Sequence, residues 1–330
     1  MKKIIALLLA LLMAVGMLAG CVKQNDDTDD TTDKLRIVTT IFPEYDWVKE
    51  ILGDKADHAD ITMLLDNGVD LHSYQPTADD IVKISDCDLF IYVGGESEGW
   101  AEDALKNSAN KDRKVINLLD VLGDSVKSEE VVEGMQEEEH EHEEGEAHEH
   151  EEEADEHVWL SLKNAEVLVG AISNALQELD AENKEIYAEN ADAYVKKLSA
   201  LDAEYQTAVD NATCKTVLFG DRFPFRYLVD DYGLNYYAAF VGCSAETEAS
   251  FETISFLAKK ADEMNLPCVL TIEGKHHKIA ETIVKNTAQK SQRILTMDSM
   301  QSTTSKDVAS GTTYLSVMEK NLAVLKEALG

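Results

Sequence analysis

The chain has 330 residues, of which 44% are hydrophobic, and its formal net charge at pH 7 is −34. The roughly 300 residues beyond the N-terminal region are enough for two ordinary domains with buried cores. A chain this acidic repels phosphate, which argues against nucleic acid as a partner and favours cationic partners.

The first residues have the features of a secretory signal. Two lysines precede an apolar run from Ile4 to Met17, which is too short to span a bilayer comfortably. The next residues, Leu-Ala-Gly-Cys21, resemble a bacterial lipobox, in which the cysteine is acylated and becomes the mature N-terminus. An ordinary signal peptide with an incidental cysteine is the alternative. We therefore expect a signal peptide over 1–20, a lipid-anchored tether over 21–34, and a location on the extracytoplasmic face of the bacterial cell membrane.

Short apolar strands alternate with amphipathic helices through the rest of the chain. Strands are predicted at 35–42, 61–65, 88–93, 114–119, 216–219, 236–241, 268–272 and 293–297. Helices are predicted at 44–52, 77–85, 100–108, 225–232, 250–264, 278–289 and 312–329. This alternation is typical of parallel sheets covered by helices on both faces. It occurs in two blocks, which predicts an α/β fold with one lobe at 35–180 and a second at 212–330.

The segment between the two blocks predicts one long helix. Tyrosines and leucines recur at spacings of three, four and seven within 181–211, which gives a helix of about 40 Å at 1.5 Å per residue. Such a helix would connect the lobes stiffly. Ligands of open parallel sheets bind beyond the carboxyl ends of the strands, so we expect the site in the cleft between the lobes.

The most unusual segment is acidic and rich in histidine. Between Glu133 and His157 there are fourteen acidic residues and five histidines, without lysine or arginine. Four of these histidines are His140, His142, His148 and His150. Such a segment cannot form a packed core, so we expect a mobile loop over 129–156. Imidazole with carboxylates suits zinc and other late first-row ions, which favours a low-affinity metal collector or sensor over an acidic spacer.

Two histidines stand at the borders of predicted elements. His72 follows a strand and precedes a capped helix, which places it at the carboxyl end of a strand, facing the cleft. His157 closes the acidic segment, and the neighbouring Trp159 would limit access of solvent to its ring. An exposed loop histidine is the alternative for His72, and the end of the histidine tract is the alternative for His157. Both are candidate metal ligands.

These segments together resemble the metal-specific solute-binding proteins of ABC importers, the zinc- and manganese-binding family. There a Gly-x-Asp-Pro-His-x-Tyr-x-Pro-type segment gives the first ligand, and Gly68–Pro76 matches it with Leu71 in place of proline. An Asp-Pro-His-x-Trp-Leu-type segment gives the second, and Asp155–Leu160 matches it with Glu156 in place of proline. The resemblance extends over essentially the whole chain, and a histidine-rich insertion before the second segment is typical of zinc-binding members.

The resemblance implies that His72 and His157 are metal ligands and that Asp298 is the late carboxylate ligand. The third ligand departs from the family pattern. Arg222 stands near its expected place, and a guanidinium cannot ligate a cation. The second lobe must therefore supply a ligand from elsewhere.

Two replacements are open. Asp221 could ligate from the neighbouring position. His277, which we prefer, would instead complete a set of three histidines and one carboxylate, the nitrogen-rich set that zinc favours. His276 and Glu273 remain candidates beside it. Arg222 would then pair with Asp221 or Asp298 and keep that carboxylate ionised.

The resemblance implies a monomeric binding protein, not an enzyme, that delivers zinc to a membrane permease driven by a cytoplasmic ATPase. Manganese is the alternative cargo if Asp221 is the ligand, because two histidines and two carboxylates suit that ion. A secreted zinc hydrolase is a rival, but neither a His-Glu-x-x-His nor a Gly-x-Ser-x-Gly motif occurs. A surface adhesion or metal-sensing lipoprotein is a second rival, because related folds are described as adhesins.

The cysteines are widely spaced and form no Cys-x-x-Cys pair. Besides Cys21 they are Cys87, Cys214, Cys243 and Cys268. Cys87 and Cys268 stand in apolar, strand-like contexts, which predicts buried thiols. One disulfide is possible outside the cell, and its pairing cannot be read from the sequence.

Overall fold

The computed structural model describes residues 34–106, 108–136, 153–244, 248–274 and 276–330. The predicted signal peptide, Cys21 and the histidines His140, His142, His148 and His150 lie outside the described residues. Residues 35–330 form one compact unit. None of the helices in the described ranges is long and apolar enough to cross a membrane.

The first sheet is parallel and has the strand order β2-β1-β3-β4. Its strands are β1 (Leu35–Thr39), β2 (Ala59–Met63), β3 (Leu89–Tyr92) and β4 (Lys114–Asn117). The α-helices that follow these strands are α2 (Phe42–Leu52), α3 (Ala78–Asp86), α4 (Trp100–Lys106) and α5 (Leu118–Leu122). Every residue of β3 is buried, as expected for a strand covered on both faces.

The second sheet repeats this arrangement with the order β6-β5-β7-β8, again all parallel. Its strands are β5 (Thr216–Phe223), β6 (Asn235–Val241), β7 (Cys268–Thr271) and β8 (Arg293–Thr296). Its α-helices are α8 (Arg226–Tyr232), α9 (Phe251–Glu263), α10 (Lys278–Asn286), α11 (Ser305–Ala309) and α12 (Tyr314–Leu329). The predicted fold class, two α/β lobes with parallel sheets, is confirmed.

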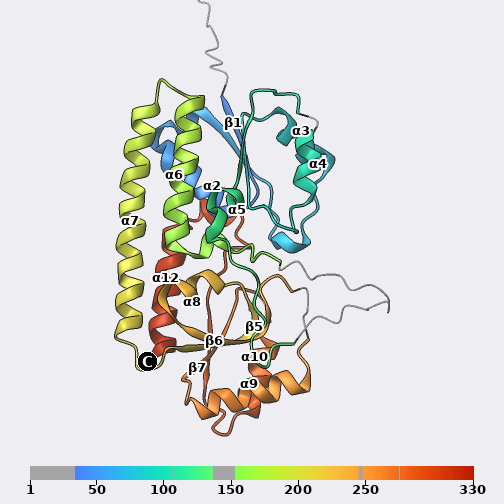
Figure 1. Ribbon diagram of the computed structural model, residues 1–330, viewed down its shortest axis with the longest axis vertical. Coiled ribbons are helices and arrows are strands. Elements are labelled where there is room, and N and C mark those ends of the chain that lie inside the picture. The colour runs from blue at the N-terminus through green and yellow to red at the C-terminus, as the bar shows by residue number, and fades with distance from the viewer. Residues whose placement is uncertain (1–33, 107, 137–152, 245–247, 275) are drawn as a thin grey trace, which may run out of the picture. The chain divides into compact units, whose positions relative to one another are not determined.

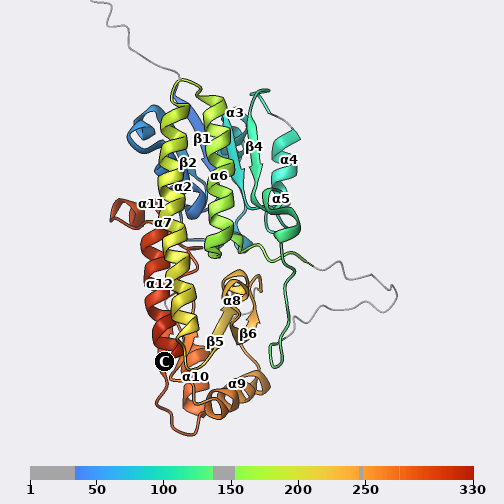
Figure 2. The same ribbon diagram turned by 60° about the vertical axis from the view of Figure 1, so that its left-hand side comes forward.

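Two long helices, α6 (Leu162–Leu179) and α7 (Lys184–Asp210), stand between the sheets in the chain. The buried residues of α7 recur at spacings of three and four: Tyr187, Ala191, Tyr194, Leu198, Leu201, Tyr205 and Val209. Its 27 residues correspond to about 40 Å of helix. In Figures 1 and 2, α7 runs beside α6 near the first sheet and beside α12 near the second, so it packs against both lobes.

The two lobes share one hydrophobic core rather than meeting at a polar surface. Trp47 of α2, Tyr194 of α7, Phe219 of β5 and Met318 of α12 all belong to the same buried cluster. A smaller second cluster lies around α9 and α10. A continuous core resists separation of the lobes, because opening it would expose apolar surface to water.

Buried hydrogen bonds reinforce the contact between the lobes. At the start of α12, the backbone N–H of Tyr314 donates to Asp46 Oδ2 of α2 at 2.8 Å. The Tyr314 hydroxyl donates to the carbonyl oxygen of Trp159 at 2.7 Å, and the Trp159 indole N–H donates to the carbonyl oxygen of Ser299 at 2.8 Å. The short segment around Trp159 is thereby fixed from both sides.

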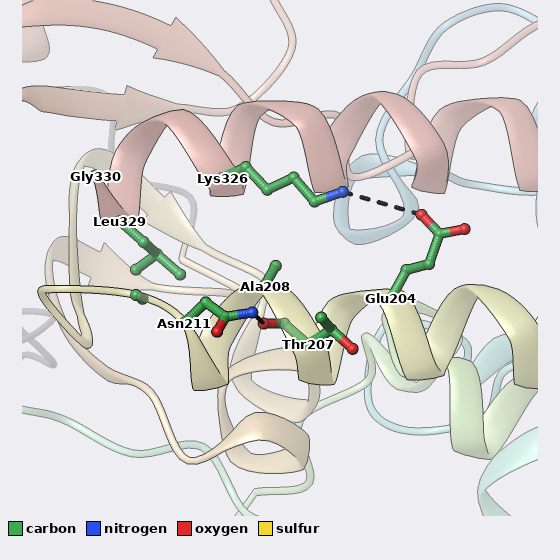
Figure 3. Close-up of a pocket in the computed structure, with 8 residues that line it drawn as sticks. Glu204, Thr207, Ala208, Asn211, Lys326, Leu329 and Gly330 are labelled. Atoms are coloured by element: carbon green, nitrogen blue, oxygen red, sulfur yellow. Dashed lines mark hydrogen bonds and ion pairs between the residues drawn. The ribbon is translucent and has the colours of Figure 1, made fainter.

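The C-terminal ends of α7 and α12 enclose a hollow of about 450 Å³ (Figure 3). Glu204 and Lys326 face each other across it at 3.9 Å, and Asn211 donates to the carbonyl oxygen of Thr207. The acidic and the basic side chain that line this hollow pair with each other. The histidines with candidate ligand roles lie elsewhere, beyond the carboxyl ends of the strands.

Candidate metal centre

His72 and His157 meet with their Nε2 atoms 3.2 Å apart. His72 lies in a 3-10 turn, Leu71–Ser73, in the connection that leaves the carboxyl end of β2. His157 directly precedes a second 3-10 turn, Val158–Leu160. The His157 side chain is fully buried, and the His72 side chain is 8% exposed. The structure thus brings together the two histidines that the sequence predicted as ligands, although 85 residues separate them.

The same kind of turn orients both histidines. In each case an aspartate stands two residues earlier, and its carboxylate accepts the backbone N–H of the histidine at 2.9 Å: Asp70 for His72 and Asp155 for His157. Aspartate commonly closes such a turn through its own side chain, so the Asp-x-His spacing is enough to build it. Each turn therefore brings a carboxylate next to the imidazole.

Polar contacts on the Nδ1 side fix the orientation of each ring. His157 Nδ1 lies 2.9 Å from Asp155 Oδ1, and His72 Nδ1 lies 2.7 Å from the Ser97 hydroxyl and 3.3 Å from Glu156 Oε2. A proton on Nδ1 satisfies these acceptors and leaves the Nε2 lone pair free. A carboxylate or hydroxyl behind the Nδ1 atom is the arrangement that supports metal-ligating histidines in general.

The acidic residues around His72 are held in their ionised form. Burial alone would raise the pKa of Asp70, but the guanidinium of Arg222 and the His72 ring outweigh burial and lower it. Burial also works against ionisation of Glu156, yet its contact with His72 and the hydrogen bond from the Ser97 backbone N–H lower its pKa. Two carboxylates, one half-buried and one buried, therefore carry negative charge beside the imidazole.

The surroundings of His157 favour a positive charge. Burial would lower the pKa of His157, but the carboxylates of Asp155, Glu156 and Asp70 outweigh it, and the net shift is upward. Two Nε2 lone pairs facing each other at 3.2 Å repel unless a proton or a cation lies between them. The two rings and their carboxylates therefore form a site for a cation.

Cys243 completes a cluster with the two histidines. Its thiol and the ligand atoms of His72 and His157 all lie within 4.8 Å of one another, and in the described part of the chain this is the one group of three or more such ligand residues. Cys243 follows the carboxyl end of β6, so the cluster draws on both lobes, as predicted for a site in the cleft.

The backbone before Cys243 is packed directly on the His157 ring. A Cβ atom on Gly242 would stand 2.9 Å from His157 Cε1, 3.0 Å from Nδ1 and 3.0 Å from the carbonyl oxygen of Phe223. A residue without a side chain is thus required here, and the end of β6 forms one wall of the site.

Glu129 fixes the Cys243 backbone from the other side. Its Oε1 atom accepts the Cys243 N–H at 2.9 Å. Glu129 belongs to a short antiparallel contact in which its own N–H donates to the carbonyl oxygen of Glu153 and Ser128 bridges to Ala154. The two arms that lead into and out of the histidine-rich segment therefore meet beside the metal centre. Burial, with the nearby carboxylates of Glu129 and Asp155, raises the pKa of the Cys243 thiol.

Arg222 makes a contact that the sequence did not predict. Its guanidinium donates to Asp70 Oδ2 at 2.7 Å and to the carbonyl oxygen of Ser244 at 3.3 Å. The predicted side-chain pairing with Asp221 or Asp298 is therefore wrong; Asp221 accepts the Arg222 backbone N–H instead. Arg222 and Ser244 belong to the second lobe and Asp70 belongs to the first. The bond from Arg222 to Asp70 therefore joins the two lobes next to the site.

The other predicted ligands lie outside the cluster. His277 and His276 line a separate cavity of about 600 Å³ together with Asp221, and His277 Nδ1 has no hydrogen-bond partner there. Glu273 accepts hydrogen bonds from the backbone N–H and the hydroxyl of Ser299.

Asp298 accepts the N–H of Met300, and burial raises its pKa. Neither Asp298 nor the preferred third ligand, His277, contributes an atom to the cluster of His72 and His157. In this structure His277 and Asp298 therefore lie apart from the two histidines, and Cys243 is the residue of the second lobe that lies beside them.

No motif in the sequence marks Cys243 as a ligand. All four cysteines in the described residues are free thiols, and Cys87 and Cys268 are buried, as predicted. Cys87 ends helix α3 and Cys268 begins strand β7, whereas Cys243 stands after the carboxyl end of β6. The available signal was its place directly after a predicted strand, where ligands of parallel sheets gather.

The distance between the two histidines fits a particular ion geometry. Two nitrogens bound at about 2.0–2.1 Å to one tetrahedral zinc ion lie about 3.3–3.4 Å apart. The observed separation of 3.2 Å between the Nε2 atoms is close to this value. A borderline-soft ion with nitrogen and sulfur ligands, such as zinc, therefore fits the cluster with little rearrangement.

Comparison with known proteins supports the same kind of site. The family described as zinc-uptake complex component A, periplasmic (ZnuA), matches residues 37–328. The zinc-binding lipoprotein AdcA of Streptococcus pneumoniae is 34% identical over 99% of this chain, which spans 61% of the length of that relative. The high-affinity zinc uptake system protein ZnuA of Bacillus subtilis is 33% identical over 91% of this chain and 89% of its own length.

A solved structure extends the likeness to three dimensions. The crystal structure of the Zn(II)-bound ZnuA-like domain of Streptococcus pneumoniae AdcA superposes with a TM-score of 0.69 at 30% sequence identity. The match covers 90% of this chain and 99% of that domain. Sequence and fold agree, and the chain belongs to the ZnuA family of zinc-uptake components.

Proposed function

We propose that this protein captures zinc outside the cell membrane and delivers it to an ABC permease for uptake. The observation that carries the proposal is the His72–His157 pair, whose Nε2 atoms lie 3.2 Å apart while polar side chains engage both Nδ1 atoms. The relatives named above as zinc-binding or zinc-uptake proteins support zinc as the cargo.

The enclosure of the two histidine rings supports binding rather than catalysis. A hydrolytic zinc site keeps one position open for water, whereas here the two buried rings are enclosed by Glu156, Gly242 and Cys243. We propose that the protein is not an enzyme, and that uptake requires a permease and its ATPase as partners.

The N-terminal region and the histidine-rich segment have supporting roles in this proposal. Cys21 carries the lipid that holds the protein at the extracytoplasmic face of the membrane, which agrees with the lipoprotein name of the Streptococcus pneumoniae relative. The histidines between 137 and 152 collect zinc with low affinity. The described residues on either side of this segment include Glu129 and Asp155, which lie beside the site.

A zinc titration against a competing chelator tests the proposal. We expect one tightly bound zinc per chain, a loss of at least a hundredfold in affinity for His157→Ala, and little change for His58→Ala, since His58 ends a 3-10 helix and is exposed. A cell dependent on this gene for growth in chelated medium should lose growth with the His157 variant. Equal zinc affinity of His157→Ala and the parent protein would refute the proposed site.

A further inference from the structure

We propose that Cys243 is the third metal ligand and that its thiolate makes the site select zinc over manganese. The inference rests on the proposed function, because it assumes that His72 and His157 hold the same ion. Cys243 thereby takes the ligand position of the second lobe, for which His277 was predicted.

The position of the thiol is the first argument. Its sulfur lies within 4.8 Å of the ligand nitrogens of both His72 and His157. In a tetrahedral zinc site with Zn–N near 2.0 Å and Zn–S near 2.3 Å, nitrogen and sulfur lie about 3.6 Å apart. A displacement on the order of 1 Å is therefore enough to bring all three atoms onto one ion.

The second argument is that three separate bonds hold the Cys243 turn at the site. The Cys243 N–H donates to Glu129, the Ser244 N–H donates to the carbonyl oxygen of Val241, and Arg222 donates to the carbonyl oxygen of Ser244. These bonds involve the segment before the histidine-rich part, strand β6 and strand β5. Glu129 and Arg222 thus hold the turn from two other segments, and the bond between Ser244 and Val241 closes the turn itself.

Arg222 can stand near the ion because its charge is paired. The other end of the Arg222 guanidinium donates to Asp70, two residues before His72. Arg222 therefore links the turn that carries His72 to the turn that carries Cys243. We assign it as a positioning residue: it cannot ligate, but it sets the distance between two ligands from different lobes.

The donor chemistry then decides the metal. Thiolate is a soft ligand that favours zinc, whereas manganese prefers carboxylate, carbonyl and water oxygens. Two imidazoles and one thiolate thus form a site in which manganese binds weakly. If a carboxylate completed the site instead, as in the alternative with Asp221, manganese would bind well.

Cobalt(II) is the probe that reports sulfur directly. It occupies tetrahedral zinc sites, and bound thiolate adds an intense charge-transfer absorption in the near ultraviolet. We expect this absorption for the parent protein and for Cys214→Ser, which replaces the other partly exposed cysteine, and we expect its loss in Cys243→Ser. In the parent protein, zinc should also protect Cys243, but not Cys214, from alkylation read by mass spectrometry, so a misfolded variant cannot decide the result.

Metal affinities give the second readout. Cys243→Ser should weaken zinc about a hundredfold, or about 2.7 kcal/mol, and should reduce the preference for zinc over manganese. Tight zinc binding without the charge-transfer absorption, and without protection of Cys243, would overturn the cysteine assignment and leave the proposed function intact. Absence of tight zinc binding in the parent protein would instead overturn the proposed function.

Discussion

The contact between Gly242 and His157 allows a perturbation of the site that changes no ligand. In Gly242→Ala the added methyl group would stand 2.9 Å from His157 Cε1 and 3.0 Å from the carbonyl oxygen of Phe223. Ordinary carbon contacts lie at about 3.5–4.0 Å. The methyl group is confined between a ring held by Asp155 and a backbone oxygen of the second sheet, so neither neighbour can move freely.

The size of the effect follows from this geometry. Relieving the overlap requires the His157 ring or the end of β6 to move by about 0.5 Å, and overpacking of this kind costs about 1–3 kcal/mol of stability. Metal–ligand distances tolerate deviations of only about 0.2 Å. We therefore expect zinc affinity to fall about ten- to a hundredfold, or about 1.4–2.7 kcal/mol.

Competition with a chelator measures zinc affinity, and denaturant unfolding in the same buffer measures stability. Gly170→Ala in α6 is the matched control, because a Cβ atom there meets no atom within 4 Å. It should leave zinc affinity unchanged and raise stability by up to about 1 kcal/mol. If Gly242→Ala bound zinc as the parent protein does, the close packing of β6 on His157 would have no part in metal binding.

Three further changes test other contacts. Arg222→Lys keeps the charge but cannot bridge Asp70 and Ser244, so zinc affinity should fall about tenfold in the chelator assay; an unchanged affinity would remove its positioning role. Trp159→Phe leaves a buried carbonyl oxygen without its donor and should cost about 1–3 kcal/mol in denaturant unfolding; a cost near zero would contradict the contact. Burial raises the pKa of Asp46 from 3.8 to about 6 in the folded protein. The stability that protonated Asp46 contributes is present at low pH and is lost as the pH rises through about 6. The free energy of unfolding of Asp46→Asn, relative to that of the parent protein, should therefore rise between pH 4 and pH 8 by at most about 3 kcal/mol. Equal pH profiles of the two proteins would contradict the shift in pKa.

Most of the fold was predictable because it depends on local patterns. The strands and helices predicted from apolar periodicity agree with the observed ones to within a few residues, and capping residues such as Thr77 start helices where expected. The helices α5 and α11, of five residues each, were not predicted, and the 18-residue helix α6 was given no bounds. One turn and a half of helix is too short to show a 3.6-residue repeat above the composition of a loop.

The same distinction between local and distant contacts applies to the metal centre. The turn that carries His72 and the turn that carries His157 are each built within three residues by an aspartate, so the sequence shows both directly. The contribution of the second lobe depends instead on which side chains cross between the lobes. The bond from Arg222 to Asp70 joins residues 152 positions apart, and no local pattern marks it.

The charges around the site explain how Cys243 can replace a ligand at position 222. Asp70, Asp155 and Glu156 place three carboxylates against the two imidazoles, and Arg222 offsets one of them. With neutral histidines and a Cys243 thiolate, three formal negative charges remain, which attract a divalent cation. Without its partner Asp70, an arginine at this place would repel the cargo; paired, it joins the lobes without excess positive charge. A ligand at position 222 is then no longer required, provided that Cys243, which Arg222 helps to hold in place, supplies the missing bond.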